Sequence, residues 1–179
     1  MIITNNEEAL RVFCEPVTLE ETGQLIEVLE KELEYGNRIG RAGIGLAGPQ
    51  ILMVKSVAIV RLPKISLNLV NAKIDKSFDP AIFEDEACLS FPGRVENTMR
   101  FQEVHVSNNL VEPHNFIATG LLAVVVQHEI NHLNSILFFD HKVSKPVLTA
   151  NKAKVGLNDK CICGSNLKYK RCCRRLNDR

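Results

Sequence analysis

The chain has 179 residues, of which 45% are hydrophobic and 24% charged, values typical of one globular domain with a sizeable core. No apolar run of about eighteen residues is present, which excludes a membrane-spanning helix. The first eight residues lack the basic and apolar pattern of a secretion or import signal. We therefore expect a cytoplasmic protein with no membrane partner.

The net charge of +1 conceals an uneven distribution. Residues 1–141 contain 11 Lys and Arg against 19 Asp and Glu, whereas residues 142–179 contain 11 against 2. A basic tail on an acidic body favours contact with a polyanion or an acidic protein surface. A solvated tail that keeps the protein soluble would have the same composition.

Residues 18–35 have the pattern of an amphipathic helix. Thr18 is an expected N-cap, and Glu21 three residues later completes the sequence of a capping box. Gly36 is expected to end the helix. Apolar residues recur at helical spacing opposite charged ones: Leu25, Ile26, Leu29 and Leu33.

Residues 43–50 read Gly-Ile-Gly-Leu-Ala-Gly-Pro-Gln, a segment in which glycine lets the backbone approach other groups closely. A phosphate-binding loop is weakly supported, because no Gly-Lys-Ser/Thr follows. The segment fits better with a site that uses the side-chain amide of Gln50 as a hydrogen-bond donor.

Short β-strands are predicted between residues 51 and 106. Segments rich in β-branched residues are separated by prolines and glycines, with Asp79-Pro80 among the breaks: 51–54, 57–61, 67–72 and 104–106. Cys88 lies in this region, within Glu86-Ala87-Cys88-Leu89-Ser90. It could be a small core residue or a metal ligand.

His128, Glu129 and His132 form the pattern H-E-x-x-H at the end of an apolar run. No proline or glycine interrupts residues 121–131, which predicts a buried helix. Residues four apart lie on one helix face, so the two imidazoles can reach one metal, and the carboxylate can take a proton from metal-bound water. A helix with no metal could carry the same three residues, so other motifs must decide.

Residues 144–158 have the composition of a linker, and four cysteines follow: Cys161, Cys163, Cys172 and Cys173. The pattern C-x-C, eight residues, then C-C favours a structural zinc site in a segment too short for its own core. Disulfides would require an oxidising compartment, for which nothing in the sequence argues.

Three motifs in this order resemble those of the peptide deformylase family, over roughly residues 1–145. The family carries G-x-G-x-A-A-x-Q, E-G-C-L-S and Q-H-E-x-D-H. They correspond here to residues 43–50, 86–90 and 127–132. The four-cysteine tail resembles a SEC-C zinc motif.

The resemblance implies an α+β fold, with small antiparallel or mixed sheets packed around a central metal-binding helix. It divides the chain into a catalytic domain at 1–143, a linker at 144–158 and a zinc-binding tail at 159–179. Cys88, His128 and His132 would hold one catalytic divalent metal, typically Fe(II) in this family, with Zn, Ni or Co as alternatives. The four tail cysteines would hold one structural zinc.

The implied reaction removes the formyl group from N-terminal formylmethionine of new polypeptides and releases formate. Metal-bound hydroxide would attack, with Glu129 as general base and then general acid. The Gln50 amide and the backbone N–H of Leu89 would stabilise the oxyanion. The resemblance also gives six candidate substrate-binding residues: Ile44, Gly45, Arg94, Leu121, Val124 and Val125. Core packing is the alternative for the apolar ones, and a solvated surface position is the alternative for Arg94.

Three positions depart from the family motifs. Gly48 replaces an alanine and loosens packing by one methyl group. Ala87 replaces a glycine and would cost about 1 kcal/mol or more if its backbone required positive φ. Asn131 replaces an aspartate and removes a negative charge near the metal, so we expect altered metal affinity or rate but retained activity.

Two other functions remain open. A metallopeptidase that cuts internal peptide bonds is disfavoured by Cys88 and the Gln50 loop. A deformylase-like binding module with little turnover, using the basic tail for partner recognition, is disfavoured by intact Glu129 and Gln50. The expected partners are formylmethionyl nascent chains and, through the tail, ribosomal RNA or protein. The tail residues that would meet RNA are Lys168, Lys170, Arg171, Arg174 and Arg175.

Overall fold

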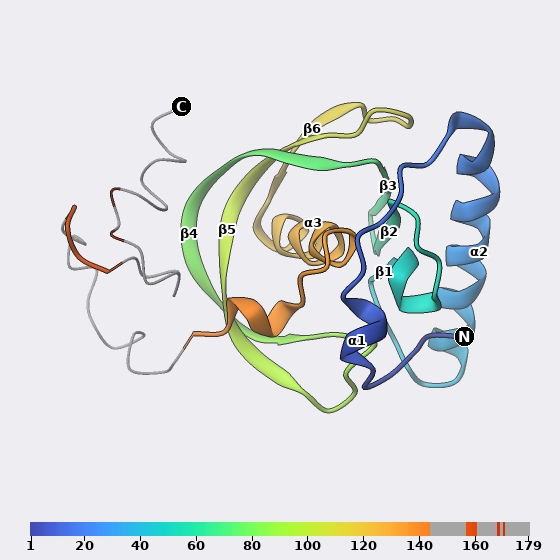
Figure 1. The fold of residues 1–179 in the computed structure, drawn as a ribbon, viewed down its shortest axis with the longest axis horizontal. Coiled ribbons are helices and arrows are strands. Elements are labelled where there is room, and N and C mark those ends of the chain that lie inside the picture. Colours follow the sequence, from blue (N-terminus) through green and yellow to red (C-terminus); the bar gives the residue numbers. More distant parts are fainter. Residues whose placement is uncertain (144–156, 161–167, 169, 171–179) are drawn as a thin grey trace.

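A computed structural model describes residues 1–143, 157–160, 168 and 170 (Figure 1). The elements are, in chain order, α1 (Glu7–Leu10), α2 (Leu19–Arg38), β1 (Gly45–Ala47), the 3₁₀-helix η1 (Gly48–Ile51), β2 (Val57–Leu62), β3 (Ile65–Val70), β4 (Lys73–Ala87), β5 (Val95–Ser107), β6 (Asn115–Thr119), α3 (Gly120–Leu133) and the 3₁₀-helix η2 (Phe138–His141). No helix in these residues is long and apolar enough to cross a membrane.

Helix α2 begins where the sequence predicted. Thr18 is its N-cap, and the capping box with Glu21 is present. The prediction that Gly36 ends the helix was wrong, because α2 continues to Arg38. Gly36 instead lets the chain fold back after the helix: its carbonyl accepts a hydrogen bond from the Arg41 N–H at 2.9 Å, and a Cβ at position 36 would lie 3.2 Å from the Arg41 carbonyl oxygen.

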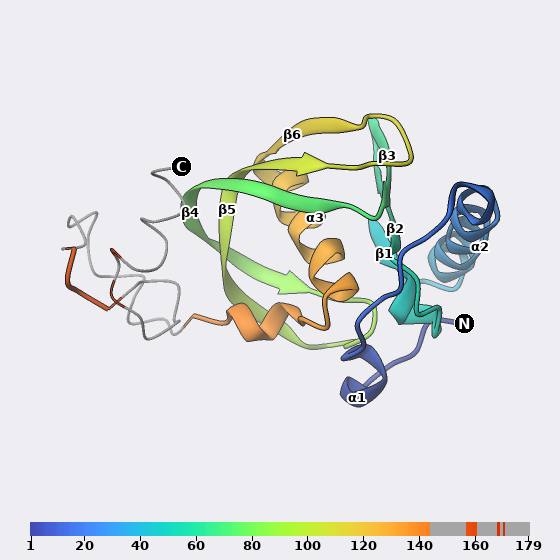
Figure 2. The ribbon, with the colours of Figure 1, turned by 45° about the horizontal axis from the view of Figure 1, so that its top comes forward.

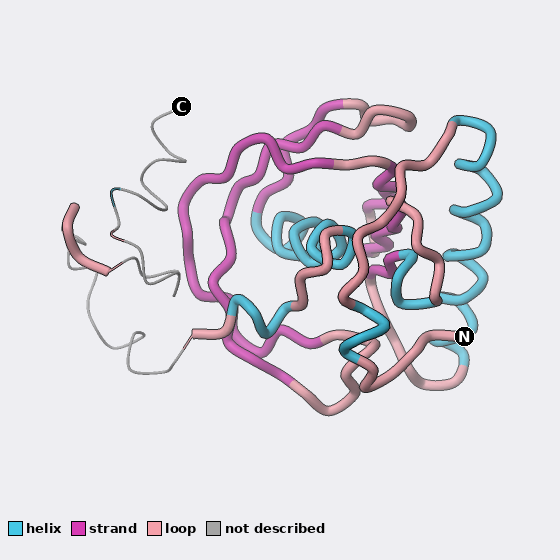
Figure 3. The backbone as a smooth tube through the Cα atoms, viewed as in Figure 1, coloured by secondary structure: helices cyan, strands magenta, loops and turns pink. Residues whose placement is uncertain are grey.

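The strands form two antiparallel sheets, in the orders β1-β2-β3 and β4-β5-β6. Helix α3 lies between them, with β4 and β5 curving around one side and β1–β3 on the other (Figures 1 and 2). Figure 3 shows the same enclosure, with strands on both sides of the α3 coil. The predicted α+β fold around a central helix is confirmed.

The alternation of side chains along β2 explains why the first sheet can be covered on both faces. Ala58 and Val60 belong to the core cluster that contains α3, whereas Val57 and Ile59 belong to the cluster that contains Leu29 and Leu33 of α2. All four β2 residues are fully buried. The sheet therefore separates α2 on the outside from α3 on the inside (Figure 2).

The strand predictions were partly correct. Residues 57–61 lie in β2, most of 67–72 lies in β3, and 104–106 lie in β5. Residues 51–54 are not a strand, because η1 ends there and Leu52 adopts a left-handed backbone with φ 63°.

Strand β4 was not predicted from the sequence, because Asp79-Pro80 was interpreted as a break between strands. Proline is tolerated in β4 because this strand is at the edge of its sheet and pairs only with β5.

The predicted buried helix at 121–131 is confirmed as α3, which extends from Gly120 to Leu133 and buries most of its length. In the tail, Lys160 and Lys168 form an antiparallel bridge, and the Lys170 N–H donates to the Leu157 carbonyl at 3.0 Å. The four tail cysteines lie outside the described residues.

Candidate metal centre

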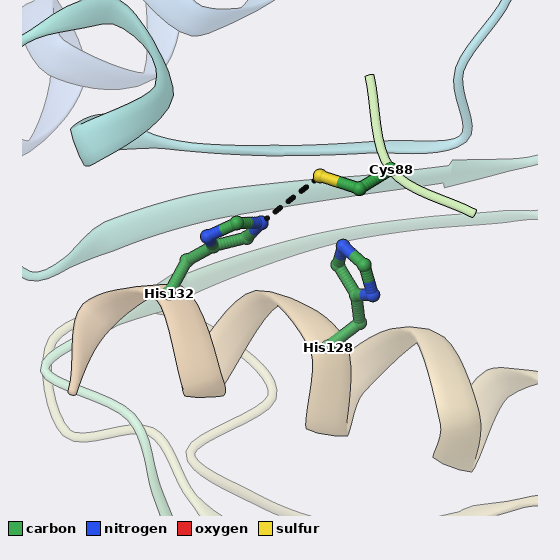
Figure 4. A group of neighbouring side chains, drawn as sticks. All are labelled: Cys88, His128 and His132. Carbon is green, nitrogen blue, oxygen red and sulfur yellow. Dashed lines mark hydrogen bonds between the residues drawn. The ribbon is translucent and has the colours of Figure 1, made fainter. Parts of the chain in front are cut away.

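Cys88, His128 and His132 come together at one point beside α3. The two histidines are one turn apart on the helix, and Cys88 directly follows β4. Each residue offers one ligand atom, and these atoms all lie within 4.8 Å of one another (Figure 4). The Cys88 Sγ and His132 Nε2 atoms are 3.4 Å apart.

This spacing fits a metal ion. Zinc bonds to cysteine sulfur and histidine nitrogen are about 2.0–2.3 Å long, so tetrahedral ligands stand about 3.6 Å apart. One thiolate and two imidazoles are natural ligands for Zn²⁺ and other first-row metals. With three protein ligands, one coordination position remains for water or substrate, as catalytic sites require.

His128 is oriented by a buried carboxylate. Its Nδ1 atom donates to Glu86 Oε1 at 2.6 Å, which leaves Nε2 for a metal. Glu86 is in turn fixed by Arg100, whose Nε and Nη2 atoms donate to its two oxygens at 2.8 and 2.6 Å, and by the Thr98 hydroxyl. The sequence reading did not identify Glu86 or Arg100 as site residues. The only available signal was an acidic residue two positions before Cys88.

The electrostatics of the centre favour a bound cation. Although burial lowers the pKa of His128, hydrogen bonds with Cys88 and Glu86 raise it to about 10. The Glu86 carboxylate thus favours positive charge at this point. Burial lowers the pKa of His132 to about 3, which keeps this imidazole in the neutral form that a metal ligand needs.

Gln50 and Glu129 complete the surroundings of Cys88. The Gln50 Oε1 atom accepts from the Ala47 N–H at 2.8 Å, so its amide nitrogen faces Cys88 Sγ at 3.5 Å and Ser90 Oγ at 3.2 Å. Glu129 is buried, burial raises its pKa to about 7, and its Oε2 atom has no hydrogen-bond partner in the described protein.

The glycines of residues 43–50 allow the close approach that the sequence predicted. A Cβ at Gly45 would lie 2.2 Å from Glu129 Oε1, and a Cβ at Gly43 would lie 2.4 Å from Leu89 Cδ1. Glycine at these two positions therefore brings the loop against two of the predicted catalytic residues.

A pocket of about 510 Å³ opens onto the ligand cluster. Five of the six predicted substrate-binding residues line it: Ile44, Gly45, Leu121, Val124 and Val125. Arg94 does not, because its guanidinium stacks 3.6 Å from the centroid of the Phe139 ring and its Nε lies 3.3 Å from Glu96. Phe83 and Arg41 also line the pocket, and the sequence reading missed both. Phe83 lies on the unpredicted strand β4, and Arg41 lies in the loop after α2.

The three departures from the family motifs are accommodated in different ways. Ala87 pairs with Val95 at the end of β4 and is not among the residues with positive φ, so the condition under which alanine would be strained is not met. The prediction that Gly48 loosens packing was wrong, because a Cβ there would lie 2.5 Å from the Met53 carbonyl oxygen. Asn131 Oδ1 accepts from Arg100 Nη1 at 2.6 Å and so joins the network behind His128.

Comparisons with known proteins agree with this geometry. The polypeptide deformylase family profile matches residues 1–147, and the SEC-C motif matches residues 158–175. A peptide deformylase from Heliobacterium modesticaldum is 36% identical over 143 residues, covering 78% of this chain and 91% of the relative.

Solved structures give the same assignment. The structure of a Thermotoga maritima peptide deformylase matches with a TM-score of 0.70 and 27% identity, over 80% of this chain and 97% of that one. A Met-Ala-Ser-bound peptide deformylase from Acinetobacter baumannii matches with a TM-score of 0.67 and 27% identity, over 79% and 96%. This chain therefore belongs to the peptide deformylase family of enzymes, which act on formylmethionyl nascent peptides.

Proposed function

We propose that this chain hydrolyses the formyl group of formylmethionyl peptides at the centre formed by Cys88, His128 and His132. The observation that carries the proposal is the Glu86–His128 hydrogen bond, which turns the His128 Nε2 toward the other two ligand atoms. A divalent metal held by these residues supplies a Lewis acid that lowers the pKa of water to near neutrality. Fe(II) is the ion proposed for the native enzyme, with Zn, Ni or Co as substitutes.

Glu129 is the proposed general base and acid. Its buried carboxylate accepts a proton from the attacking water as the bond to the formyl carbon forms. It then donates this proton to the methionine nitrogen as the C–N bond breaks, giving formate and a free N-terminus. The close approach of Gly45 to one carboxylate oxygen supports this role, and the other oxygen has no hydrogen-bond partner among the described residues.

Gln50 and Leu89 are the proposed oxyanion donors. The Gln50 amide nitrogen is held on the side of Cys88, where negative charge would develop on the formyl oxygen. The backbone N–H of Leu89, the residue after the ligand cysteine, is the second donor. Removing one such donor typically costs about 10²–10³ in kcat.

The apolar part of the pocket is the proposed methionine site. It is lined by five apolar residues together with Cys88 and His128: Ile44, Phe83, Leu121, Val124 and Val125. The Acinetobacter baumannii relative bound to Met-Ala-Ser supports a peptide with N-terminal methionine as occupant. We assign no peptide contact to Arg94, since it stacks on Phe139 and meets Glu96.

The decisive experiment measures formate release from a formylmethionyl peptide by anaerobically purified full-length protein, with the metal content determined on the same sample. Release should require the metal and should fall by at least about a hundredfold in Glu129→Ala. The matched control is Glu84→Ala, which removes an exposed carboxylate of β4 outside the pocket. No release from protein with a filled metal site would instead favour the binding-module function.

We propose that the chain consists of a catalytic domain at 1–143, a linker at 144–158 and a zinc-binding tail at 159–179. The family matches at 1–147 and 158–175 support this division. We propose that Cys161, Cys163, Cys172 and Cys173 bind a structural zinc. Cys161→Ser should then lose one zinc per chain and keep the catalytic metal.

The proposed partner of the tail is ribosomal RNA, in the cytoplasm where formylated chains are made. Its support is the basic charge of residues 142–179 and the exposure of Lys168 and Lys170. Binding to ribosomes should fall steeply as salt rises, because each phosphate contact releases counterions. Salt-insensitive binding would indicate a protein partner, and no binding would leave the tail a structural role.

A further inference from the structure

Arg41 lies in the pocket wall and is held there by two hydrogen bonds. It follows α2, and its backbone N–H donates to the Gly36 carbonyl at 2.9 Å. Its Nη2 atom donates to the Leu89 carbonyl at 3.0 Å. The side chain is half-buried, so its guanidinium is positioned by the fold and does not extend freely into solvent.

The charge of Arg41 is not neutralised within the described part of the chain. No ion pair joins it to a carboxylate there, and the Leu89 carbonyl is its only side-chain hydrogen-bond partner. A guanidinium has five N–H donors, so most remain available. Among the described residues that line the pocket, Arg41 is the only arginine and there is no lysine.

Neither acidic residue of the pocket forms an ion pair with Arg41. Glu86 is bound by Arg100 and His128, and Glu129 is buried against Gly45. The second arginine near this region, Arg94, is paired with Glu96 outside the pocket lining. Arg41 therefore presents an unpaired positive charge to whatever fills the pocket.

Its position relative to the reacting group indicates which part of a peptide it meets. Leu89 is both the proposed oxyanion donor, through its N–H, and the hydrogen-bond partner of Arg41, through its C=O. The guanidinium and the proposed site of the formyl oxygen are thus both neighbours of Leu89, one on its C=O side and the other on its N–H side. Successive peptide residues advance about 3.3–3.6 Å, so the second and third residues of a bound peptide come within reach of a long side chain.

We propose that Arg41 is a specificity-determining residue that favours formylmethionyl peptides with an acidic side chain at the second or third position. This inference rests on the proposed function of the same site. Charge-assisted pairing of a guanidinium with a carboxylate is bidentate where the geometry permits. Lysine at the same peptide position would be repelled.

The test compares kcat/KM for formate release from amidated peptides that differ at one position. The series is formyl-Met-X-Ala and formyl-Met-Ala-X, with X as Glu, Gln or Lys. We expect Glu to exceed Gln by about two- to fivefold at one of the two positions, as for a partly exposed ion pair, with Lys lowest. The preference should shrink at high salt.

Three variants separate charge recognition from a structural role. Arg41→Gln should remove the Glu-to-Gln preference, and Arg41→Lys should keep part of it because the charge remains. Arg94→Gln, which alters the paired arginine outside the pocket, should keep the preference of the wild type. Each ratio compares kcat/KM for two peptides with the same protein variant. A general loss of activity, caused by a disturbance of Leu89, would lower both values and leave the ratio unchanged.

Equal kcat/KM for the Glu, Gln and Lys peptides in the wild type would overturn the inference. The same preference in Arg41→Gln as in the wild type would also overturn it. Failure of the proposed function has a different signature, since the neutral Gln peptides would then release no formate at all.

Discussion

Gly45 lies so close to Glu129 that a Cβ at position 45 would be 2.2 Å from the carboxylate Oε1 atom. Real atoms do not approach so closely, so any other residue must push the carboxylate away. Glu129 sits on α3, which is enclosed by both sheets, and the helix has little freedom to yield. The glycine and the proposed general base therefore fit together as one unit.

Gly45→Ala should lower kcat for formate release by about a hundredfold, the scale of a misplaced general base, while the protein keeps its metal. Steady-state kinetics and metal analysis on one sample check this. The control is Gly23→Ala in α2, where a Cβ meets nothing within 4 Å. It should leave kcat unchanged and raise the unfolding free energy by about 0.5–1 kcal/mol. Unchanged kcat in Gly45→Ala would disprove the predicted displacement.

Glu86→Gln should weaken metal binding and destabilise the fold. The variant leaves Arg100 buried without its carboxylate and removes the anion that fixes the His128 tautomer. Loss of such an orienting partner typically costs 10- to 100-fold in metal affinity, and breaking a buried ion pair costs about 3–5 kcal/mol. Competition with a chelator and denaturant unfolding measure the two effects.

Glu30→Gln provides the comparison for Glu86, because it breaks a partly exposed pair with Arg61. This substitution should lower the free energy of unfolding by less than about 1 kcal/mol and leave metal affinity unchanged. Equal metal affinity in the Glu86 variant and the wild type would argue against the orienting role of this carboxylate.

Asn131→Asp restores the family residue and should tighten metal retention while activity persists. Asn131 accepts from Arg100 at 2.6 Å, so aspartate would add a negative charge to the network behind His128. We expect a change of up to about tenfold, the lower range for such outer residues. Dialysis against chelator and steady-state kinetics report it. Identical metal retention and kinetics in both proteins would dispose of the idea.

Gly48→Ala also restores a family residue, but here it should destabilise the protein by about 1–3 kcal/mol. The added Cβ would lie 2.5 Å from the Met53 carbonyl oxygen and 2.9 Å from that of Lys55, both backbone atoms that cannot rotate away. Thermal unfolding of variant and wild type measures the loss. A melting temperature equal to or above that of the wild type would show that the loop after η1 yields easily.

Stability in acid should depend on Asp140. Arg11 donates to both of its oxygens at 2.7 Å, and these hydrogen bonds lower the pKa of the Asp140 carboxyl. A group with a depressed folded pKa stabilises the fold above its unfolded pKa of about 3.9, and this contribution is lost as pH falls through the folded value. The stability difference between wild type and Asp140→Asn should therefore shrink between about pH 5 and pH 3. Urea unfolding at both pH values tests it, and an equal difference at both would contradict it.

Local patterns allowed much of the fold to be predicted. The capping box of α2 and the unbroken apolar run of α3 are properties of neighbouring residues, and both helices begin within a residue of the predicted position. The pair His128 and His132 follows from helix geometry alone. Strand β4 was missed because Asp79-Pro80 is a local break signal, which an edge strand tolerates.

The rest of the site depends on contacts between distant segments. Glu86 meets Arg100 only because β4 and β5 pair in one register, which the sequence does not reveal. The sequence could not show that Arg41 lines the pocket and that Arg94 does not. Side-chain direction in loops is set by tertiary partners, here Leu89 for Arg41 and Phe139 for Arg94.

The enclosure of α3 between two separately hydrogen-bonded sheets has a consequence for local opening. Amide protons of this helix should be among the slowest to exchange with deuterium, whereas those of residues 40–44 and 88–94, outside any helix or strand, should exchange sooner. We therefore expect the two histidines to lie in the most slowly exchanging element of the fold and Cys88 in a less protected segment. A partly opened molecule would then be able to hold a bound ion through His128 and His132 and to regain the thiolate as it closes.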